Sequence, residues 1–223
     1  MNVRTLAAAT LALGLSACAQ QMGAVSITAI CSPPTPEVGS TGGYSCTYPA
    51  ECATFITTGK LDATTARLDF RLPLQFVNQL ADNSSTPDGR VNTNDATVQS
   101  LEVTYAGGGY LEPWNVAVSI PVATAGTSSA LVALIPLQYF PSMAPASPSA
   151  TAHYVVSVRA HGVFASGDAF TSAWFQVPVD VCAGCLSNMG GCATGSVPVF
   201  CPAPAPGQVS PGQTAGFACI ALQ

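Results

Sequence analysis

The regular alternation of apolar and polar residues most limits how this chain can fold. Residues 66–76, ARLDFRLPLQF, alternate in this way, and the segments beginning at residues 100, 115, 153 and 173 repeat the pattern. A period of two residues is typical of a strand with one buried face, because successive side chains point to opposite faces. The expected inward positions are Leu68, Phe70, Leu72, Leu74, Phe76, Leu101, Val103, Tyr105, Val116, Val118, Ile120, Val122, Tyr154, Val156, Val158, Ala160, Phe175, Val177, Val179 and Val181.

Turn-rich segments separate about eight expected strands, and no segment after the first seventeen residues has a helical period. Residues 130–140, ALVALIPLQYF, are apolar on both faces and predict a central strand, with Leu131, Ile135 and Leu137 on one face and Pro136 at a bulge or edge. Residues 24–31 and 53–58 predict shorter strands. Many strands joined by Gly- and Pro-rich turns predict an all-β, antiparallel β-sandwich.

Residues 153–179, HYVVSVRAHGVFASGDAFTSAWFQVPV, resemble the final hairpin of fibronectin type III and related immunoglobulin-like domains. In those domains a Tyr opens a strand that ends in a VRA-like run, and a Ser-bearing last strand follows. The resemblance implies an Ig-like sandwich. No cysteine pair of the antibody type, joining the second and sixth strands, is evident in the sequence.

The composition changes after Val181, where five cysteines occur among many Gly and Pro residues. Such a stretch cannot build a core and needs covalent cross-links. We therefore expect a tether over residues 18–24, a sandwich domain over 25–181 and a disulfide-rich C-terminal extension over 182–223, packed on the sandwich. The VCAGCL motif resembles that of cysteine-rich envelope lipoproteins to which no activity is assigned.

The N-terminal residues have the features of an export signal. One basic residue, Arg4, precedes an uncharged run over residues 5–14. This run is too short to span a bilayer, which needs about 20 apolar residues. The sequence Leu15-Ser16-Ala17-Cys18 resembles the lipobox of bacterial lipoproteins.

The lipobox resemblance implies that residues 1–17 are a signal peptide, that the chain is cut before Cys18, and that this cysteine carries acyl chains. Two or more acyl chains hold a protein stably in a membrane. The residues after Cys18 are Ala19 and Gln20. In enterobacterial lipoproteins an Asp next to the cysteine retains the protein in the inner membrane, so its absence favours the outer membrane of a Gram-negative bacterium.

The cysteine count fits lipidation of Cys18. The sequence has nine cysteines, and an odd number in an exported protein leaves one thiol to explain. Without Cys18, eight remain for disulfides in an oxidising compartment. These candidates are Cys31, Cys46, Cys52, Cys182, Cys185, Cys192, Cys201 and Cys219. Three lie early and five late, so complete pairing within the chain requires at least one bridge between the two groups.

Two other interpretations of the cysteines remain open. Cys182 and Cys185 have the CxxC spacing of a redox pair, although such a pair is expected to open a helix. The run CAGCLSNMGGC also has the spacing of a zinc knuckle, but neither histidine lies near it. We favour structural disulfides.

The low charge excludes several partners. Charged residues are 8% of the chain, with six basic and eleven acidic residues, against about 25% charged in typical soluble domains. Nucleic-acid binding requires several Lys or Arg contacts to phosphate. We expect no nucleic-acid partner and no polybasic membrane patch. Membrane attachment is expected through Cys18 alone.

Residues 88–95, DGRVNTND, match the second half of an EF-hand calcium loop. The calcium candidates are Asp88, Asn92 and Asp95. Ser84 and Thr86 stand where the first half of the loop needs ligands. The favoured interpretation is an acidic turn whose Asp and Asn side chains bond their own backbone.

No residue pattern predicts catalysis, and we expect neither enzyme activity nor a cofactor. His153 and His161 lie eight residues apart on one expected strand, about 26 Å at 3.3 Å per residue, and their parity places both on the solvent face. No GxSxG motif is present. The exposed aromatic candidates for ligand binding are Tyr110, Trp114 and Trp174, although Trp114 could instead open its strand and pack at the end of the sandwich.

The sequence thus predicts a non-catalytic, lipid-anchored envelope protein, a cell-surface binding, adhesion or structural module with a protein or glycan ligand. The alternatives are a surface-anchored hydrolase or carbohydrate-binding protein and, with less support, a calcium-dependent binding protein using residues 88–95.

Overall fold

The structure is a computed structural model. The residues it describes are 23–32, 37–38, 44–45, 51–64, 69–84, 91–147, 150–184, 196–200 and 217–221. The expected signal peptide and lipobox, including Cys18, lie outside these ranges, as do Leu68, Asp88 and the cysteines at positions 46, 185, 192 and 201. Cys219 lies in a described strand whose side chains are not described.

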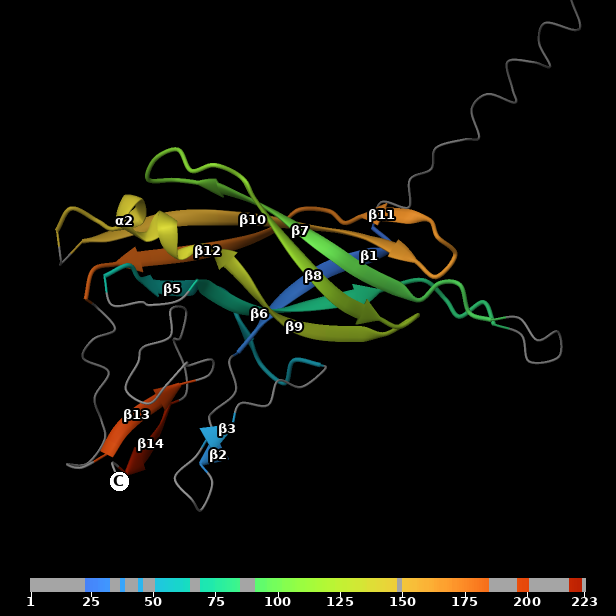
Figure 1. Ribbon diagram of the computed structural model, residues 1–223, viewed down its shortest axis with the longest axis horizontal. Helices are drawn as coiled ribbons and strands as arrows, with labels where there is room; N and C mark the ends of the chain where they lie inside the picture. The colour runs from blue at the N-terminus through green and yellow to red at the C-terminus, as the bar shows by residue number, and fades with distance from the viewer. Residues whose placement is uncertain are drawn as a thin grey trace, which may run out of the picture.

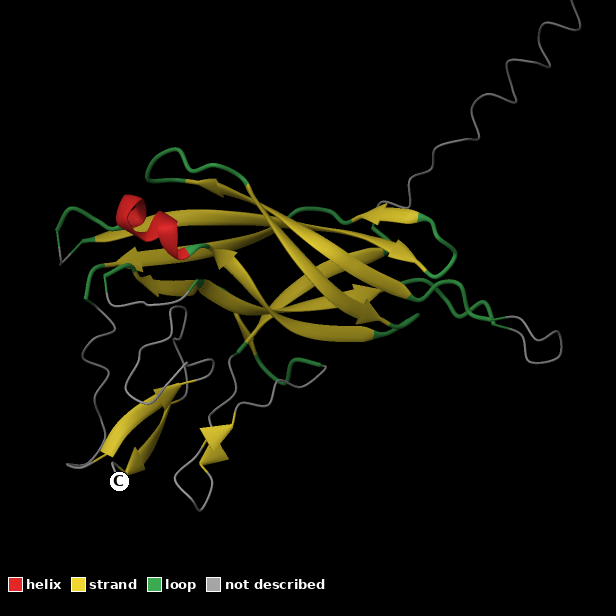
Figure 2. Ribbon diagram, in the orientation of Figure 1, coloured by secondary structure: helices red, strands yellow, loops and turns green. Residues whose placement is uncertain are grey.

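Two β-sheets, antiparallel except for one strand pair, form the body of the molecule (Figures 1 and 2). The first sheet has the order β4-β1-β6-β9, with every neighbouring pair antiparallel. Its strands are β4 (Phe55–Ile56), β1 (Val25–Cys31), β6 (Phe70–Asn78) and β9 (Thr127–Ile135). The all-β class expected from the alternation is confirmed.

The second sheet has the order β5-β12-β10-β7-β8, and β11 also pairs with β10. Its strands are β5 (Gly59–Asp62), β12 (Phe175–Cys182), β10 (Thr151–Phe164), β7 (Ala96–Ala106), β8 (Trp114–Val122) and β11 (Ala169–Thr171). The β5–β12 pair is parallel, and the other pairs are antiparallel. The short strands β5 and β11 carry little alternation and were not expected from the sequence.

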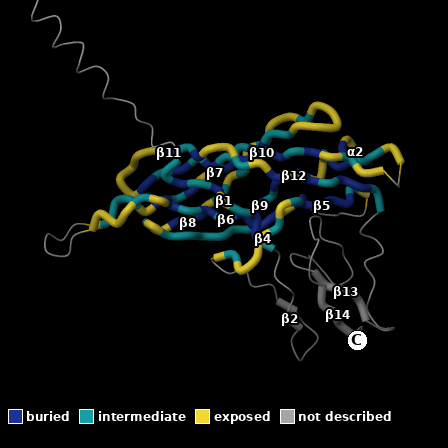
Figure 3. The backbone as a smooth tube through the Cα atoms, turned by 180° about the vertical axis from the view of Figure 1, so that it is seen from behind, coloured by how far each residue is buried: buried dark blue, intermediate teal, exposed yellow. Residues whose placement is uncertain are grey.

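A single hydrophobic cluster includes residues of both sheets (Figure 3). Phe70, Leu72, Leu74 and Phe76 of β6 are buried, as are Val156, Val158 and Ala160 of β10 and the three valines of β12. Tyr105, Val116, Val118 and Phe175 are partly buried against this cluster. Each fully buried side chain of this size contributes about 1.5–3 kcal/mol through the hydrophobic effect. The expected inward faces are therefore confirmed wherever the structure describes them.

The strand expected over residues 130–140 is wrong beyond Ile135, and its expected central position is also wrong, because among the described strands β9 pairs only with β6 and lies at the edge of the first sheet. β9 ends at Ile135, and the chain continues as a 3-10 helix, Leu137–Tyr139, and the short helix α2, Phe140–Met143. Leu137, expected on the same face as Ile135, is 41% exposed, whereas Phe140 and Met143 are buried. Pro136 explains the change, because proline lacks the N–H that a continuing ladder needs.

Two small ribbons lie beside the sandwich-like body. β2 (Glu37–Val38) pairs with β3 (Tyr44–Ser45), and β13 (Ser196–Phe200) pairs with β14 (Phe217–Ala221). β14 makes contacts with β2. The contact between β14 and β2 is consistent with at least one disulfide between the early and late cysteine groups. That disulfide remains a prediction.

Two of the eight candidate cysteines form a disulfide within the early group. Cys31 of β1 is bonded to Cys52, with 5.1 Å between their Cα atoms and a sequence separation of 21. Closing a loop of that length stabilises the fold by about 3 kcal/mol in the chain-entropy model. Cys182 at the end of β12 is also disulfide-bonded, and its partner lies outside the side chains that the structure describes.

None of the helices in the described ranges is long and apolar enough to cross a bilayer.

Candidate binding site

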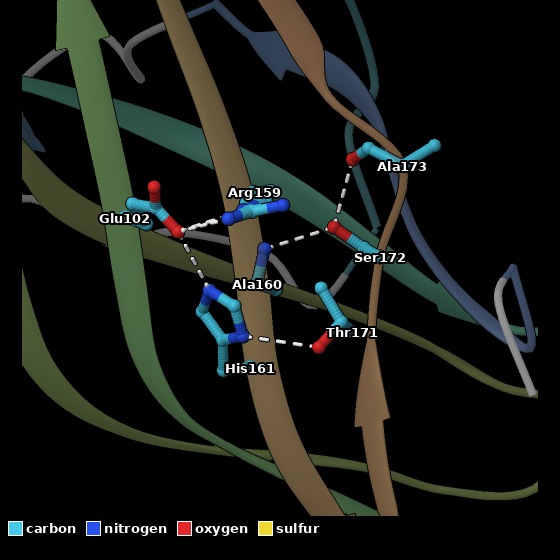
Figure 4. Close-up of polar contacts among 7 residues, drawn as sticks. All are labelled: Glu102, Arg159, Ala160, His161, Thr171, Ser172 and Ala173. Carbon is cyan, nitrogen blue, oxygen red and sulfur yellow. Dashed lines mark hydrogen bonds and ion pairs between the residues drawn. The ribbon is translucent and has the colours of Figure 1, made fainter. Parts of the chain in front are cut away.

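Four polar side chains meet on the outer face of the second sheet (Figure 4). Glu102 of β7 lies opposite Arg159 of β10 in the strand register. Glu102 Oε2 accepts a hydrogen bond from Arg159 Nε at 2.7 Å, and Arg159 Nη2 forms an ion pair with the same oxygen at 2.7 Å. His161 Nε2 lies 3.1 Å from the same carboxylate oxygen. His161 Nδ1 lies 3.1 Å from Thr171 Oγ1 of β11. We call Glu102, Arg159, His161 and Thr171 the polar cluster.

The charges of the polar cluster change the acidity of Glu102. Partial burial acts to raise the pKa of this carboxyl, but hydrogen bonds and positive charge from Arg159 and His161 outweigh it and hold the pKa below its ordinary value of 4.5. The Arg159 guanidinium also lies 4.5 Å from the centre of the Trp174 ring, a cation–π contact. Glu102 is therefore held as a carboxylate at neutral pH.

The hydrogen-bonded row runs from Thr171 through His161 to Glu102. A catalytic triad has the same arrangement of a nucleophile, a base and a carboxylate that orients the base. The sequence analysis missed this grouping because the three residues come from three strands. Two features weaken a catalytic interpretation. Glu102 is shared with Arg159, and none of the cluster residues lines the cavity described below.

The backbone beside the polar cluster is already hydrogen-bonded (Figure 4). The N–H of Ala160 donates to Ser172 Oγ at 2.8 Å, and the Ser172 hydroxyl donates to the Ala173 carbonyl at 2.9 Å. These donors are not available to stabilise an oxyanion, which catalytic acyl transfer needs. The arrangement fits a structural role in which polar contacts join β7, β10 and β11.

The histidines occupy the outer face, as their parity predicted. His153 is exposed, and its Nδ1 lies 2.7 Å from Asp180 Oδ1 across the β10–β12 pair. His161 is partly buried in the polar cluster. Each histidine thus has its own carboxylate partner.

Two of the three calcium candidates, Asn92 and Asp95, lie in the described ranges and have hydrogen-bond partners within the fold. Asp95 Oδ1 accepts hydrogen bonds from the Thr124 N–H and hydroxyl, both at 2.9 Å, and from Asn92 Nδ2 at 3.2 Å. Asn92 Nδ2 also lies 2.7 Å from Thr124 Oγ1. No group of three or more His, Cys, Asp or Glu side chains suited to a metal ion occurs in the described ranges. The Asn94 N–H donates to Asn92 Oδ1 at 3.0 Å, which is the kind of local side-chain-to-backbone bond that the turn interpretation expects; residues 85–90, which hold the first part of the motif, lie outside the described ranges.

The three aromatic candidates have different surroundings. Tyr110, in the loop between β7 and β8, is 86% exposed, and Trp174, just before β12, is 43% exposed. Trp114 is the first residue of β8 and is partly buried, as its alternative interpretation expected. Arg159 lies over the ring of Trp174.

A cavity of about 640 Å³ opens where the two sheets meet. Its walls come from β1, β4, β6 and the beginning of β12, and none of its lining residues is ionisable. The lining residues are Thr28, Ala29, Ile30, Phe55, Ile56, Thr57, Gln75, Val77, Phe175 and Gln176. Gln75 Oε1 is buried and has no hydrogen-bond partner among the described residues. No sequence pattern predicted this cavity, because its walls are distant along the chain.

No family model, curated protein or solved structure matches this chain.

Proposed function

We propose that this chain is a non-catalytic binding module, anchored in the bacterial outer membrane through acyl chains on Cys18 and built on an Ig-like sandwich. The observation that carries the binding role is the uncharged cavity lined by β1, β4, β6 and the beginning of β12, on the face of β6 that carries Gln75 and Val77. A module of this kind uses its fold to present a binding surface and its lipid to stay at the membrane.

The strand order supports the Ig-like assignment. Without the short β4, the first sheet reads β1-β6-β9, which matches strands A, B and E of an immunoglobulin-like domain. Without β5, which pairs in parallel with β12, and β11, which pairs with β10, the second sheet reads β12-β10-β7-β8, the order of strands G, F, C and C′. The chain also changes sheet at the corresponding places, between β6 and β7, between β8 and β9 and between β9 and β10.

The cavity supports binding rather than catalysis. Its volume of about 640 Å³ lies within the range of about 300–1,000 Å³ typical of ligand pockets. Its walls combine apolar side chains with the hydroxyl and amide groups of Thr28, Thr57, Gln75 and Gln176. General acid–base chemistry needs a titratable group within reach of the substrate, and these walls supply none.

A surface hydrolase is the second candidate, and the Thr171–His161–Glu102 row is the observation in its favour. A purified protein that hydrolyses p-nitrophenyl acetate, and loses this activity in His161→Ala, would support that candidate. We expect the wild type and His161→Ala to give the same background rate.

The anchor is tested by expressing the full chain and Cys18→Ser in a Gram-negative host. We expect the wild type in the outer-membrane fraction, with an N-terminal peptide whose mass shows acyl chains on Cys18. The Cys18→Ser chain should leave this fraction, because the thiol that accepts the lipid is absent. Recovery of Cys18 unmodified, or in a disulfide, would contradict the proposed anchor.

A further inference from the structure

We propose that the cavity receives an extended, uncharged peptide segment of a partner protein, which adds as a β-strand at the seam between β1 and β12. The inference rests on the proposed binding function and names the class of ligand. Three features of the seam support it: unpaired strand edges, uncharged walls and an unpartnered amide oxygen.

The seam is closed at one end by the protein itself. β4 pairs with β1 only at Ile30 and Cys31. After Thr57 and Thr58 the chain continues as β5, which pairs with β12 from Val179 to Cys182. One short segment thus covers the edges of both sheets in turn.

Beyond this segment both edges are open. On the side of β1 away from β6, no described strand pairs with residues 25–29. On the side of β12 away from β10, no described strand pairs with residues 175–178. Pro178 fits such a position, since proline within a sheet is confined to edges and bulges. Thr28 and Ala29 from the first edge, and Phe175 and Gln176 from the second, line the cavity.

Unpaired edges favour a peptide over other ligands. Backbone N–H and C=O groups along a free edge are a template for another strand, and strand addition supplies main-chain hydrogen bonds to the incoming peptide. A lipid chain or other hydrocarbon could fill the same volume, but it would leave these groups and Gln75 Oε1 without partners, which is unfavourable for buried polar atoms.

The walls define the side chains that such a peptide should carry. Phe55, Ile56 and Val77 give the cavity apolar surface, and Phe55 is 59% exposed. A charged side chain placed here would lose its hydration without meeting an opposite charge. The matching segment therefore alternates apolar residues with small polar ones, and one of its donors can bond Gln75 Oε1.

The test uses the purified, disulfide-intact protein and the heptapeptide Thr-Val-Thr-Val-Thr-Val-Thr-amide, which carries fluorescein on its N-terminal amine in place of an acetyl group. Fluorescence anisotropy should show saturable binding. The same peptide with proline at its centre should bind about tenfold more weakly, because it lacks one main-chain donor. Amide hydrogen exchange should slow at residues 25–29 and 175–177 and remain unchanged in the centre of β7.

A matched pair of protein variants locates the site. Phe55→Glu places a charge at the cavity mouth on an exposed side chain, so it should fold normally and weaken peptide binding by about tenfold. Val91→Glu is the control, because Val91 is 80% exposed and does not line the cavity. It should bind the peptide as the wild type does.

Three results would overturn the inference: no saturable peptide binding, equal affinity for the proline peptide, or protection confined to other strands. Binding of palmitate that Phe55→Glu abolishes, without peptide binding, would assign the cavity to a lipid chain instead. None of these results bears on the proposed lipid anchor, because acylation of Cys18 is measured in a separate experiment. Loss of the anchor would likewise leave the peptide result standing.

Discussion

At the scale of single residues, Glu102 shows how partners on neighbouring strands set the state of a side chain. Its Oε2 atom contacts Nε and Nη2 of Arg159 and also Nε2 of His161. These partners hold the pKa of the Glu102 carboxyl below its ordinary value of 4.5. Glu102 and Arg159 are partly exposed, at 25% and 33% of their side-chain surface, so solvent screens the interaction.

The lowered pKa of Glu102 predicts a pH dependence of stability. Because the folded carboxyl binds its proton less readily than the unfolded one, its contribution is present above the unfolded pKa and is lost as the pH falls through the folded value. We expect Glu102→Gln to lower the free energy of unfolding at pH 7, and its difference from the wild type to become smaller as the pH falls below 4.5. Urea denaturation at pH 7, 5 and 3 measures this difference.

Glu112→Gln is the control, because the exposed Glu112 carboxylate has no ion-pair partner in the described ranges. Its difference from the wild type should stay small at all three pH values. An equal loss of stability in Glu102→Gln at pH 7 and pH 3 would show that the ionised carboxylate is not the source.

At the scale of elements, β10 is the strand on which the second sheet depends. It pairs with β7, β11 and β12, and its register with β7 shifts between His161 and Gly162. Gly162 lies in close contact with Thr97 and the Phe170 ring, and the Phe170 and Phe164 ring centres are 5.0 Å apart. The absence of a side chain at Gly162 therefore allows β7 and β11 to pack at this bulge.

Gly162→Ala should accordingly destabilise the fold. The added Cβ would come within 2.8 Å of Phe170 Cε1 and would also overlap the Thr97 carbonyl oxygen. Overpacking of this kind costs about 1–3 kcal/mol. Thermal unfolding followed by circular dichroism measures the loss. Ser119→Thr also adds a methyl group, but at an exposed position of β8, and should stay within about 0.5 kcal/mol of the wild type. Equal melting temperatures for Gly162→Ala and Ser119→Thr would refute the packing argument.

At the scale of the whole molecule, the two sheets share one core and should unfold together. The hydrophobic cluster joins β6 and β9 of the first sheet to β7, β10 and β12 of the second. Tyr105 of β7 also donates a hydrogen bond to the Leu134 carbonyl of β9 at 2.8 Å. Burial raises the pKa of the Tyr105 hydroxyl, so the phenol remains protonated as this donor.

This shared core is tested by changing one sheet and observing the other. Leu74→Ala empties a fully buried position of β6 and should cost about 2–5 kcal/mol. Both tryptophans belong to the region of the second sheet, Trp114 in β8 and Trp174 just before β12. Tryptophan fluorescence and far-UV circular dichroism should therefore shift to the same lower urea midpoint.

Arg71→Ala is the control, because Arg71 lies on the exposed face of the same strand. It should leave both midpoints within error of the wild type. Separate transitions for fluorescence and circular dichroism in Leu74→Ala would mean that the two sheets unfold independently.

The sequence by itself determined the all-β class, most long strands and their inward faces. This is because alternation is a local property: which side of a strand Leu74 or Val156 occupies follows from counting along the chain. Pro136 marked an irregularity at the end of β9, but the sequence did not predict the helical turn that follows, in which Phe140 is buried and Leu137 is exposed.

Only the tertiary structure decided which distant residues meet. Strand pairing brings Glu102 beside Arg159 and His161, and it places Thr28 and Phe175 on the walls of one cavity. No local pattern encodes these meetings, because they depend on the order and register of strands far apart in the sequence. The residues that carry the proposed binding function were therefore visible only after the two sheets had been assembled.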